Sequence, residues 1–181
     1  LTAIIGTGTI INDESAYFNV ANTTIGPSLT PSTNANTVTY IGSATQTVRA
    51  TTNPYYHVAV NKTGTNQLKV IGSFSSASLP ITGNLNMIAG WFVPKIGTSG
   101  TVTITVGGNY HQTEGTMSLY GGTSSGTTNL TVSGNFTLDD GTFDFSSATG
   151  SGTGAGTVNV DGHFHHEDGI FTVLTANNAI G

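Results

Sequence analysis

The chain has 181 residues, a formal net charge of −5 and only 7% charged residues. It has no cluster of Lys and Arg to bind phosphates, which excludes nucleic acid as a partner. It has no cysteine, which excludes disulfides and thiolate metal sites, and no apolar run reaches the roughly 18 residues of a membrane span. Its 25 glycines and many Thr, Ser and Asn residues favour strands and turns, so we expect an all-β fold.

The first segment, residues 1–36, shows no clear period, and its stretch GPSLTPSTNAN has the prolines and small polar residues of a loop. We expect an irregular cap here, or a strand that the chain donates to a neighbour. LTAIIGTGTII, at residues 1–11, is the candidate donor strand, because an exposed sheet edge accepts an added strand.

Residues 37–181 are predicted to form one repetitive domain. Residues 37–78 are degenerate, with TVTYIG, YYHVAV and LKVIGSF as the expected strands. Four clearer copies then align without gaps: LPITGNLNMIAGWFVP (79–94), ITVGGNYHQTEGTMSL (104–119), LTVSGNFTLDDGTFDF (130–145) and VNVDGHFHHEDGIFTV (158–173). Successive copies start 25, 26 and 28 residues apart, which indicates a repeat architecture.

Two glycines recur at a fixed phase in every copy, and we expect both to form turns through a positive φ. The first is Gly83, Gly108, Gly134 or Gly162, and the second is Gly90, Gly115, Gly141 or Gly169. Apolar residues two and nine positions after the first glycine are expected to form a buried core ladder. They are Leu85, Tyr110, Phe136 and Phe164, and Phe92, Met117, Phe143 and Phe171.

A repeat of this length with three short strands has the size of one coil of a parallel β-helix, in which like side chains stack about 4.8 Å apart. We therefore predict a right-handed parallel β-helix, or β-solenoid, with coils of 25–28 residues. The handedness follows from the general chirality of strand connections. The alternative is an antiparallel β-sandwich, because short strands with glycine turns also form hairpins.

The order of motifs in TVTYIGSATQTVRATTNPYYHVAVNKTGTNQLKVIGSFSSASLPITGNLNMIAG resembles the repeats of large exported bacterial surface proteins of the adhesin-like β-helix type. The similarity extends over about residues 37–175. The resemblance implies an extracellular or cell-surface, fibre-forming β-helix. It supplies no catalytic residues to carry over to this chain.

Three of the five histidines lie with three acids in VNVDGHFHHEDGIF, residues 158–171, which is the composition of a metal or catalytic site. Aligned with the other copies, however, His163 and His165 replace polar residues at outward-facing positions. We interpret them as surface substitutions, with a metal site as the alternative. His166 falls in a mixed column that we place at the edge of the core.

The acids before the second glycine form a more regular pattern. A carboxylate column two residues wide is predicted along one corner of the coils, formed by Glu114, Asp139, Asp140, Glu167 and Asp168. Stacked carboxylates repel one another unless a cation or solvent intervenes, and calcium accepts about six to eight oxygen ligands in loose geometry. The column is therefore a candidate Ca²⁺ site, with a solvated acidic corner as the alternative.

We predict no catalytic residues and no enzyme. Asp139, Asp140 and Asp144 are the candidate carboxylates of a carbohydrate-cleaving enzyme, but no Lys or Arg follows residue 96 to stabilise developing negative charge. A carbohydrate-binding or carbohydrate-cleaving module, with Trp91 and Tyr120 stacking on sugar, is the alternative function. Ice binding is a minor alternative. TVTITV has alternating threonines, but the aligned segments LPITG, LTVSG and VNVDG do not keep them.

The predicted function is a structural subunit or stalk module of an extracellular bacterial fibre or adhesin that assembles through strand edges. The expected partner is a second copy stacked head to tail, or flanking repeats of a longer chain. The charge distribution favours the head-to-tail arrangement, because every cation precedes residue 96 whereas seven of the nine acids follow it. The cations are Arg49, Lys62, Lys69 and Lys95.

Overall fold

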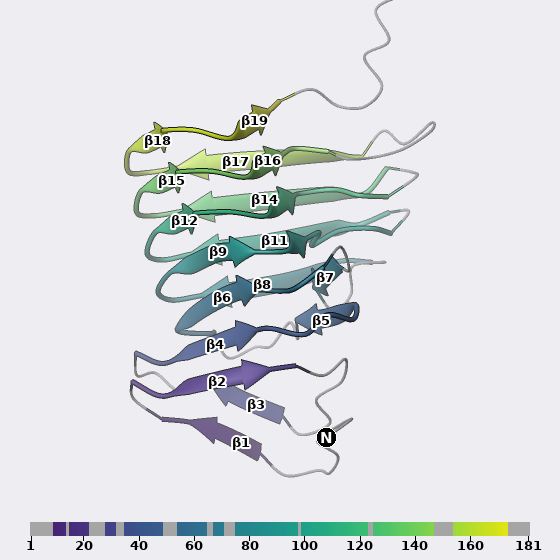
Figure 1. Ribbon diagram of the computed structural model, residues 1–181. Helices are drawn as coiled ribbons and strands as arrows, with labels where there is room; N and C mark the ends of the chain where they lie inside the picture. Colours follow the sequence, from purple (N-terminus) through teal and green to yellow (C-terminus); the bar gives the residue numbers. More distant parts are fainter. Residues whose placement is uncertain are drawn as a thin grey trace, which may run out of the picture.

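The computed structural model is a parallel β-solenoid, in which the chain winds into stacked coils (Figure 1). It describes residues 9–13, 15–21, 28–31, 35–48, 54–64, 67–70, 75–97, 99–122, 125–146 and 154–173. Every strand pair in these ranges is parallel. The predicted solenoid is therefore confirmed, with about four regular turns of about 26 residues, and the antiparallel sandwich is wrong.

The longest wall of the solenoid is a seven-stranded sheet that runs through the whole stack (Figure 1). In spatial order from the N-terminal end, its strands are β2 (Tyr17–Val20), β4 (Thr37–Tyr40), β6 (His57–Asn61), β9 (Leu85–Ala89), β12 (Tyr110–Gln112), β15 (Phe136–Leu138) and β18 (Phe164–His166). This wall connects the less regular N-terminal coils to the four regular ones.

Two further sheets complete the regular coils. The six-stranded wall contains β5 (Gln46–Val48), β7 (Gln67–Val70), β10 (Trp91–Phe92), β13 (Thr116–Ser118), β16 (Thr142–Asp144) and β19 (Ile170–Thr172). The four-stranded wall contains β8 (Ala77–Ile81), β11 (Thr101–Val106), β14 (Thr127–Val132) and β17 (Ala155–Val160). At the N-terminal end, β1 (Thr9–Asn12) and β3 (Ser28–Pro31) form a separate two-stranded sheet.

The core forms because alternate side chains of each strand point into the coil, as the pleat requires. The register aligns Leu85, Tyr110, Phe136 and Phe164 in one column, and Phe92, Met117, Phe143 and Phe171 in another. The rings of Tyr110 and Phe136 stack with centroids 4.5 Å apart. The rings of Phe143 and Phe171 stack with centroids 5.4 Å apart. Each such pair contributes about 0.5–1.5 kcal/mol beyond the burial of its area.

Burial stops at the last coil. Leu85, Tyr110 and Phe136 are fully buried, whereas Phe164 at the end of the same column is 49% exposed. The reason is that β18 is an edge strand, with β15 as its one neighbour among the described strands. The expectation that Phe164 is buried is therefore wrong, although its place in the column is as the repeats indicate.

The segment predicted to be irregular takes part in the stack. β2 pairs in parallel with β4, and Phe18 packs against the core. The predicted boundary after residue 36 therefore falls between two strands of one sheet. Residues 1–8 of the candidate donor strand lie outside the described residues, and β1, which includes residues 9–11, pairs with β3 of the same chain. The handedness of the coil stays a prediction.

Candidate functional site

A ladder of asparagine side chains runs along the start of β9, β12 and β15. The Oδ1 atom of Asn84 accepts a hydrogen bond from the backbone N–H of Asn109 at 2.9 Å, and Asn109 accepts one from the N–H of Asn135 at 2.8 Å. Asn135 in turn accepts the N–H of His163 at 3.0 Å. Each side chain therefore satisfies a turn amide of the next coil, and each bond contributes about 1 kcal/mol.

The glycine before each of these residues leaves room for the ladder. A Cβ atom at Gly108 would lie 2.3 Å from the Oδ1 of Asn84, and one at Gly134 would lie 2.3 Å from the Oδ1 of Asn109. The positive φ expected at the first glycine of each repeat is wrong, because it occurs at the second glycine alone. The φ values there are 89° at Gly90, 75° at Gly115, 88° at Gly141 and 80° at Gly169.

Histidine replaces asparagine at the two ends of the ladder. The Nδ1 atom of His57 accepts the N–H of Asn84 at 2.9 Å, and a Cβ at Gly83 would lie 2.6 Å from that nitrogen. His57 is half-buried, and desolvation by burial lowers its pKa. His163 occupies the equivalent position in the last coil, directly before Phe164 of β18.

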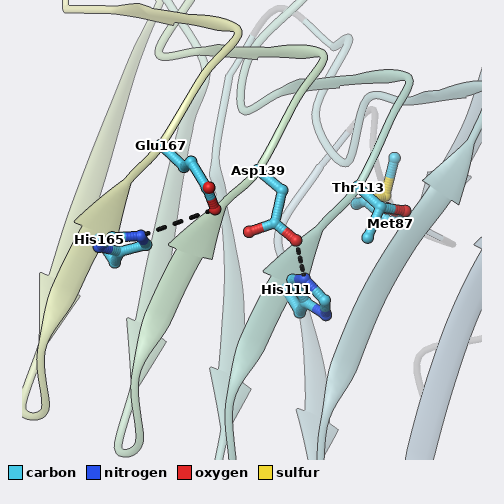
Figure 2. A network of polar contacts seen from close by, with 6 residues as sticks. All are labelled: Met87, His111, Thr113, Asp139, His165 and Glu167. Carbon is cyan, nitrogen blue, oxygen red and sulfur yellow. Dashed lines mark hydrogen bonds and ion pairs between the residues drawn. The ribbon is translucent and has the colours of Figure 1, made fainter.

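Two contacts between imidazoles and carboxylates lie on the outer surface of the same wall (Figure 2). The Nε2 of His111 lies 2.6 Å from the Oδ2 of Asp139 in the next coil, with side chains 44% and 37% exposed. His165 and Glu167, two positions apart in one coil, approach to 3.9 Å. The comparison of the repeats missed both pairs because neither lies within one column. Exposed pairs of this kind contribute less than about 1 kcal/mol.

The predicted acidic corner is divided among different contacts. Asp139 and Glu167 face histidines, whereas Asp140 and Asp168 each accept the N–H of the glycine that follows, at 2.6 and 2.7 Å. Glu114 is exposed. Among the residues that the structure describes, no group of three or more His, Asp or Glu side chains has the arrangement of a metal site. Calcium binding along this corner stays a prediction.

The outer face of the four-stranded wall is uncharged. The register aligns one column of Ser78, Thr103, Asn129 and Thr157 and a second of Pro80, Thr105, Thr131 and Asn159. At the start of these strands, the hydroxyls of Thr101 and Thr127 lie 2.8 Å apart. The aligned segments predicted that the threonines of TVTITV are not kept. The structure refines this, because most replacements retain a hydroxyl or an amide.

Lys62 is buried, and none of the described carboxylates is its partner. The side chain is 2% exposed. Its Nζ donates to the carbonyl oxygens of Gly42 and Ala44 at 2.6 and 2.8 Å, and to the Oε1 of Gln46 at 2.8 Å. The three ammonium donors are therefore satisfied by neutral oxygens. Desolvation by burial lowers the pKa of Lys62 to about 8.

Lys95 repeats this arrangement in a later coil. It is fully buried, and its Nζ donates to the carbonyl oxygens of Ser75 and Ser99. Desolvation by burial lowers its pKa as well. Because Lys62 and Lys95 are buried, the N-terminal half is less cationic at its surface than its sequence suggests. The electrostatic argument for head-to-tail assembly is therefore weakened.

The side chains considered for catalysis or sugar binding are dispersed. Asp144 is half-buried, desolvation raises its pKa, and its Oδ1 accepts the N–H of Ser146 at 3.0 Å. Tyr120 is fully buried and donates its hydroxyl to the carbonyl of Gly97 at 3.2 Å, so the prediction that it stacks on a sugar is wrong. Trp91 is half-buried. Within the described ranges, no helix has the length and apolarity of a membrane span.

Comparisons of the chain with protein-family models, with curated proteins and with solved structures give no match. The structure shows the class of fold, which is a repetitive β-solenoid. The resemblance to adhesin repeats therefore rests on the order of the sequence motifs.

The asparagine ladder is the feature that comparison of the repeats did not identify. Its signal is present in the sequence as the dipeptide Gly-Asn at residues 83–84, 108–109 and 134–135. Within one repeat, the glycine alone predicts a turn and the asparagine alone predicts an exposed polar position. The steric dependence between the two becomes visible only when the coils are stacked, because the asparagine of one coil approaches the glycine of the next.

Proposed function

We propose that this chain is a structural stalk module of an extracellular bacterial fibre or adhesin, and that its open ends stack on further coils. The location of exposed apolar side chains carries the proposal. Six large hydrophobic residues in the described part of the chain are exposed, and five of them belong to the first and last coils. These five are Ile11, Tyr17, Phe164, Ile170 and Val173.

The same ends have strand edges that pair with no further strand among the described residues. β2 and β18 are the two edge strands of the seven-stranded wall. An unpaired strand edge recruits another strand unless it is covered, charged or interrupted by proline. Stacking a further coil on β18 would bury Phe164 as Phe136 is buried one coil below. The motif order that resembles adhesin repeats supports the extracellular location.

The asparagine ladder supports one kind of partner coil over another. Each acceptor side chain lies against a glycine of the next coil, as His57 does against Gly83. A coil that continues the ladder on β18 therefore needs a glycine opposite His163. In the first coil the register places Ala16 at that position. A flanking repeat with glycine fits the open end better than the first coil of a second copy.

The proposal is tested by association of the purified chain, measured by sedimentation velocity and electron microscopy over a range of concentrations. We expect weak end-to-end association that appears only at high concentration, because Ala16 fits the ladder less well than glycine would, and Phe164→Asp should suppress it. Ile88→Asp is the control, because Ile88 is 41% exposed on a middle coil. A chain that stays monomeric at high concentration would count against the proposal, and glycan-array binding by that monomer would favour a carbohydrate-binding module.

Ice binding is a second candidate, favoured by the uncharged columns on β8, β11, β14 and β17. Apart from Pro80 on β8, hydroxyl and amide groups repeat there along each strand and from coil to coil, with no charged side chain in either column. We expect inhibition of ice recrystallisation that Thr105→Lys abolishes and Asn86→Lys, on another wall, does not. Absence of inhibition by the wild-type chain would eliminate this candidate.

A further inference from the structure

We call the interface between two stacked coils a seam. The seam between the coil that contains β6 and the coil that contains β9 differs from the seams nearer the C-terminus. Along the seven-stranded wall, the pairing of β6 with β9 is interrupted by a register shift between Val60 and Asn61. Below β8, the described pairing of the four-stranded wall is a single bridge between Tyr55 and Ile81. By contrast, β11 pairs with β14 along six consecutive residues, from Thr101 to Val106. In the described part of the four-stranded wall, this seam is therefore paired less extensively than the seams above it, and the ladder bond lies beside the remaining pairing of β6 with β9.

The ladder acceptor at this seam is titratable. At the later rungs the acceptor is an amide oxygen, which keeps its lone pairs at any physiological pH. Here it is the Nδ1 of His57, which accepts the N–H of Asn84 at 2.9 Å only when that nitrogen is unprotonated. Protonation would place an imidazolium N–H against the N–H of Asn84, two donors facing each other.

Nothing charged among the described neighbours would stabilise an imidazolium at this position. A depression of about 290 Å³ at the site is lined by Ser15, Tyr17, Ala35, Thr37, His57, Asn84 and Asn86. The ring of Tyr56 lies edge-on to the imidazole, with centroids 4.6 Å apart. Among the residues that line the depression or contact the imidazole, the titratable groups besides His57 are the phenols of Tyr17 and Tyr56. The described surroundings therefore contain no carboxylate that faces His57.

We propose that His57 is an acid-sensitive joint, closed by its neutral imidazole and loosened by protonation, between the N-terminal coils and the four regular coils. Desolvation lowers the pKa of His57 in the folded chain below the ordinary 6.5 of histidine. A lowered folded-state pKa means that the unfolded or opened state binds protons more readily. The contribution of His57 to stability is thus complete above about pH 6.5 and is lost as the pH falls through the folded-state pKa.

The joint is tested by amide hydrogen exchange of the wild-type chain at pH 7.5 and pH 5, corrected for intrinsic rates. We expect protection of the Asn84 amide to fall about tenfold at the lower pH, consistent with loss of one hydrogen bond. The amides of Asn109 and Asn135 are internal controls, because asparagine oxygens accept them. Equal protection of Asn84 at both pH values would overturn the proposal.

A pair of variants separates titration from general acid effects. His57→Asn introduces the acceptor of the later rungs, so its Asn84 amide should keep the same protection at both pH values. Asn109→His places a titratable acceptor between the coil of β12 and the coil of β15. The hydrogen-exchange protection of the Asn135 amide should then fall at pH 5. If His57→Asn loses protection at pH 5 as the wild type does, the imidazole is not the cause and the joint is excluded.

Discussion

The side-chain oxygen of Asn109 accepts the backbone N–H of Asn135 at 2.8 Å, while the N–H of Asn109 itself donates to Asn84 at 2.9 Å. One residue therefore links three successive coils. We expect Asn109→Ala to lower the free energy of unfolding by about 1 kcal/mol, because the amide of Asn135 loses its acceptor at an exposed position. Urea unfolding measures this change.

Asn109→Asp is the matched control for the ladder. A carboxylate oxygen retains the acceptor at nearly the same position, so the amide of Asn135 should stay protected in hydrogen exchange. Asn109→Ala should expose it. Equal exchange rates in both variants would show that the side chain contributes little to the stacking of the coils.

The second glycine of each repeat is predicted to be intolerant of a side chain for two reasons that can be separated. Gly115 is one of these second glycines and has a φ of 75°, whereas Gly64, which lies outside the four aligned copies, has a φ of 83°. A Cβ at Gly64 would meet nothing within 4 Å, whereas one at Gly115 would lie 2.5 Å from the carbonyl oxygen of Gly90. We expect Gly64→Ala to cost about 1–2 kcal/mol, the conformational strain alone.

Gly115→Ala should cost about 3 kcal/mol or more, because the strain adds to a clash with backbone of the coil below. Thermal unfolding of both variants measures the difference. If the two costs are the same, the close stacking of glycines between coils does not limit the sequence at this position.

The fold was predictable because the solenoid repeats its information. The four aligned copies place Tyr110 and Phe136 in one column from the sequence alone, and the register confirms this prediction. Contacts that cross columns carry no such signal. His111 and Asp139 occupy different positions of different copies, so alignment of the copies does not bring them together. The burial of Lys62 likewise has no signal in the sequence, because two of its three acceptors are backbone carbonyl oxygens, which every residue has.

Lys62 is predicted to stabilise the coil in which it is buried. Lys62→Met removes the ammonium group and leaves the carbonyl oxygens of Gly42 and Ala44 without this donor. We expect a loss of about 3 kcal/mol at pH 7, since a buried group that loses its hydrogen-bond partner costs about 1–3 kcal/mol. Lys69→Met is the control, because Lys69 is half-buried on β7, and its effect should be smaller. An unchanged stability of Lys62→Met would show that burying the charge offsets its hydrogen bonds.

The pair of His111 and Asp139 is expected to contribute little despite its short distance of 2.6 Å. Both side chains are more than a third exposed, and solvent and salt screen such pairs. A double-mutant cycle with His111→Ala and Asp139→Ala should give a coupling energy below about 1 kcal/mol at pH 6, decreasing in high salt. A larger, salt-independent coupling would indicate a structural role that exposure does not suggest.

Ala16 provides the sharpest test of which coil continues the stack. If copies of this chain join head to tail in the register of the seven-stranded wall, Tyr17 lies over His163 and Ala16 over Gly162. The Cβ of Ala16 would then approach the imidazole of His163 as closely as a Cβ at Gly83 would approach His57, about 2.6 Å. Ala16→Gly should therefore strengthen self-association several-fold in sedimentation velocity, and Ala16→Val should weaken it. If both variants associate like the wild type, the ends meet in another register, or the coil that fits β18 belongs to a flanking repeat with its own glycine.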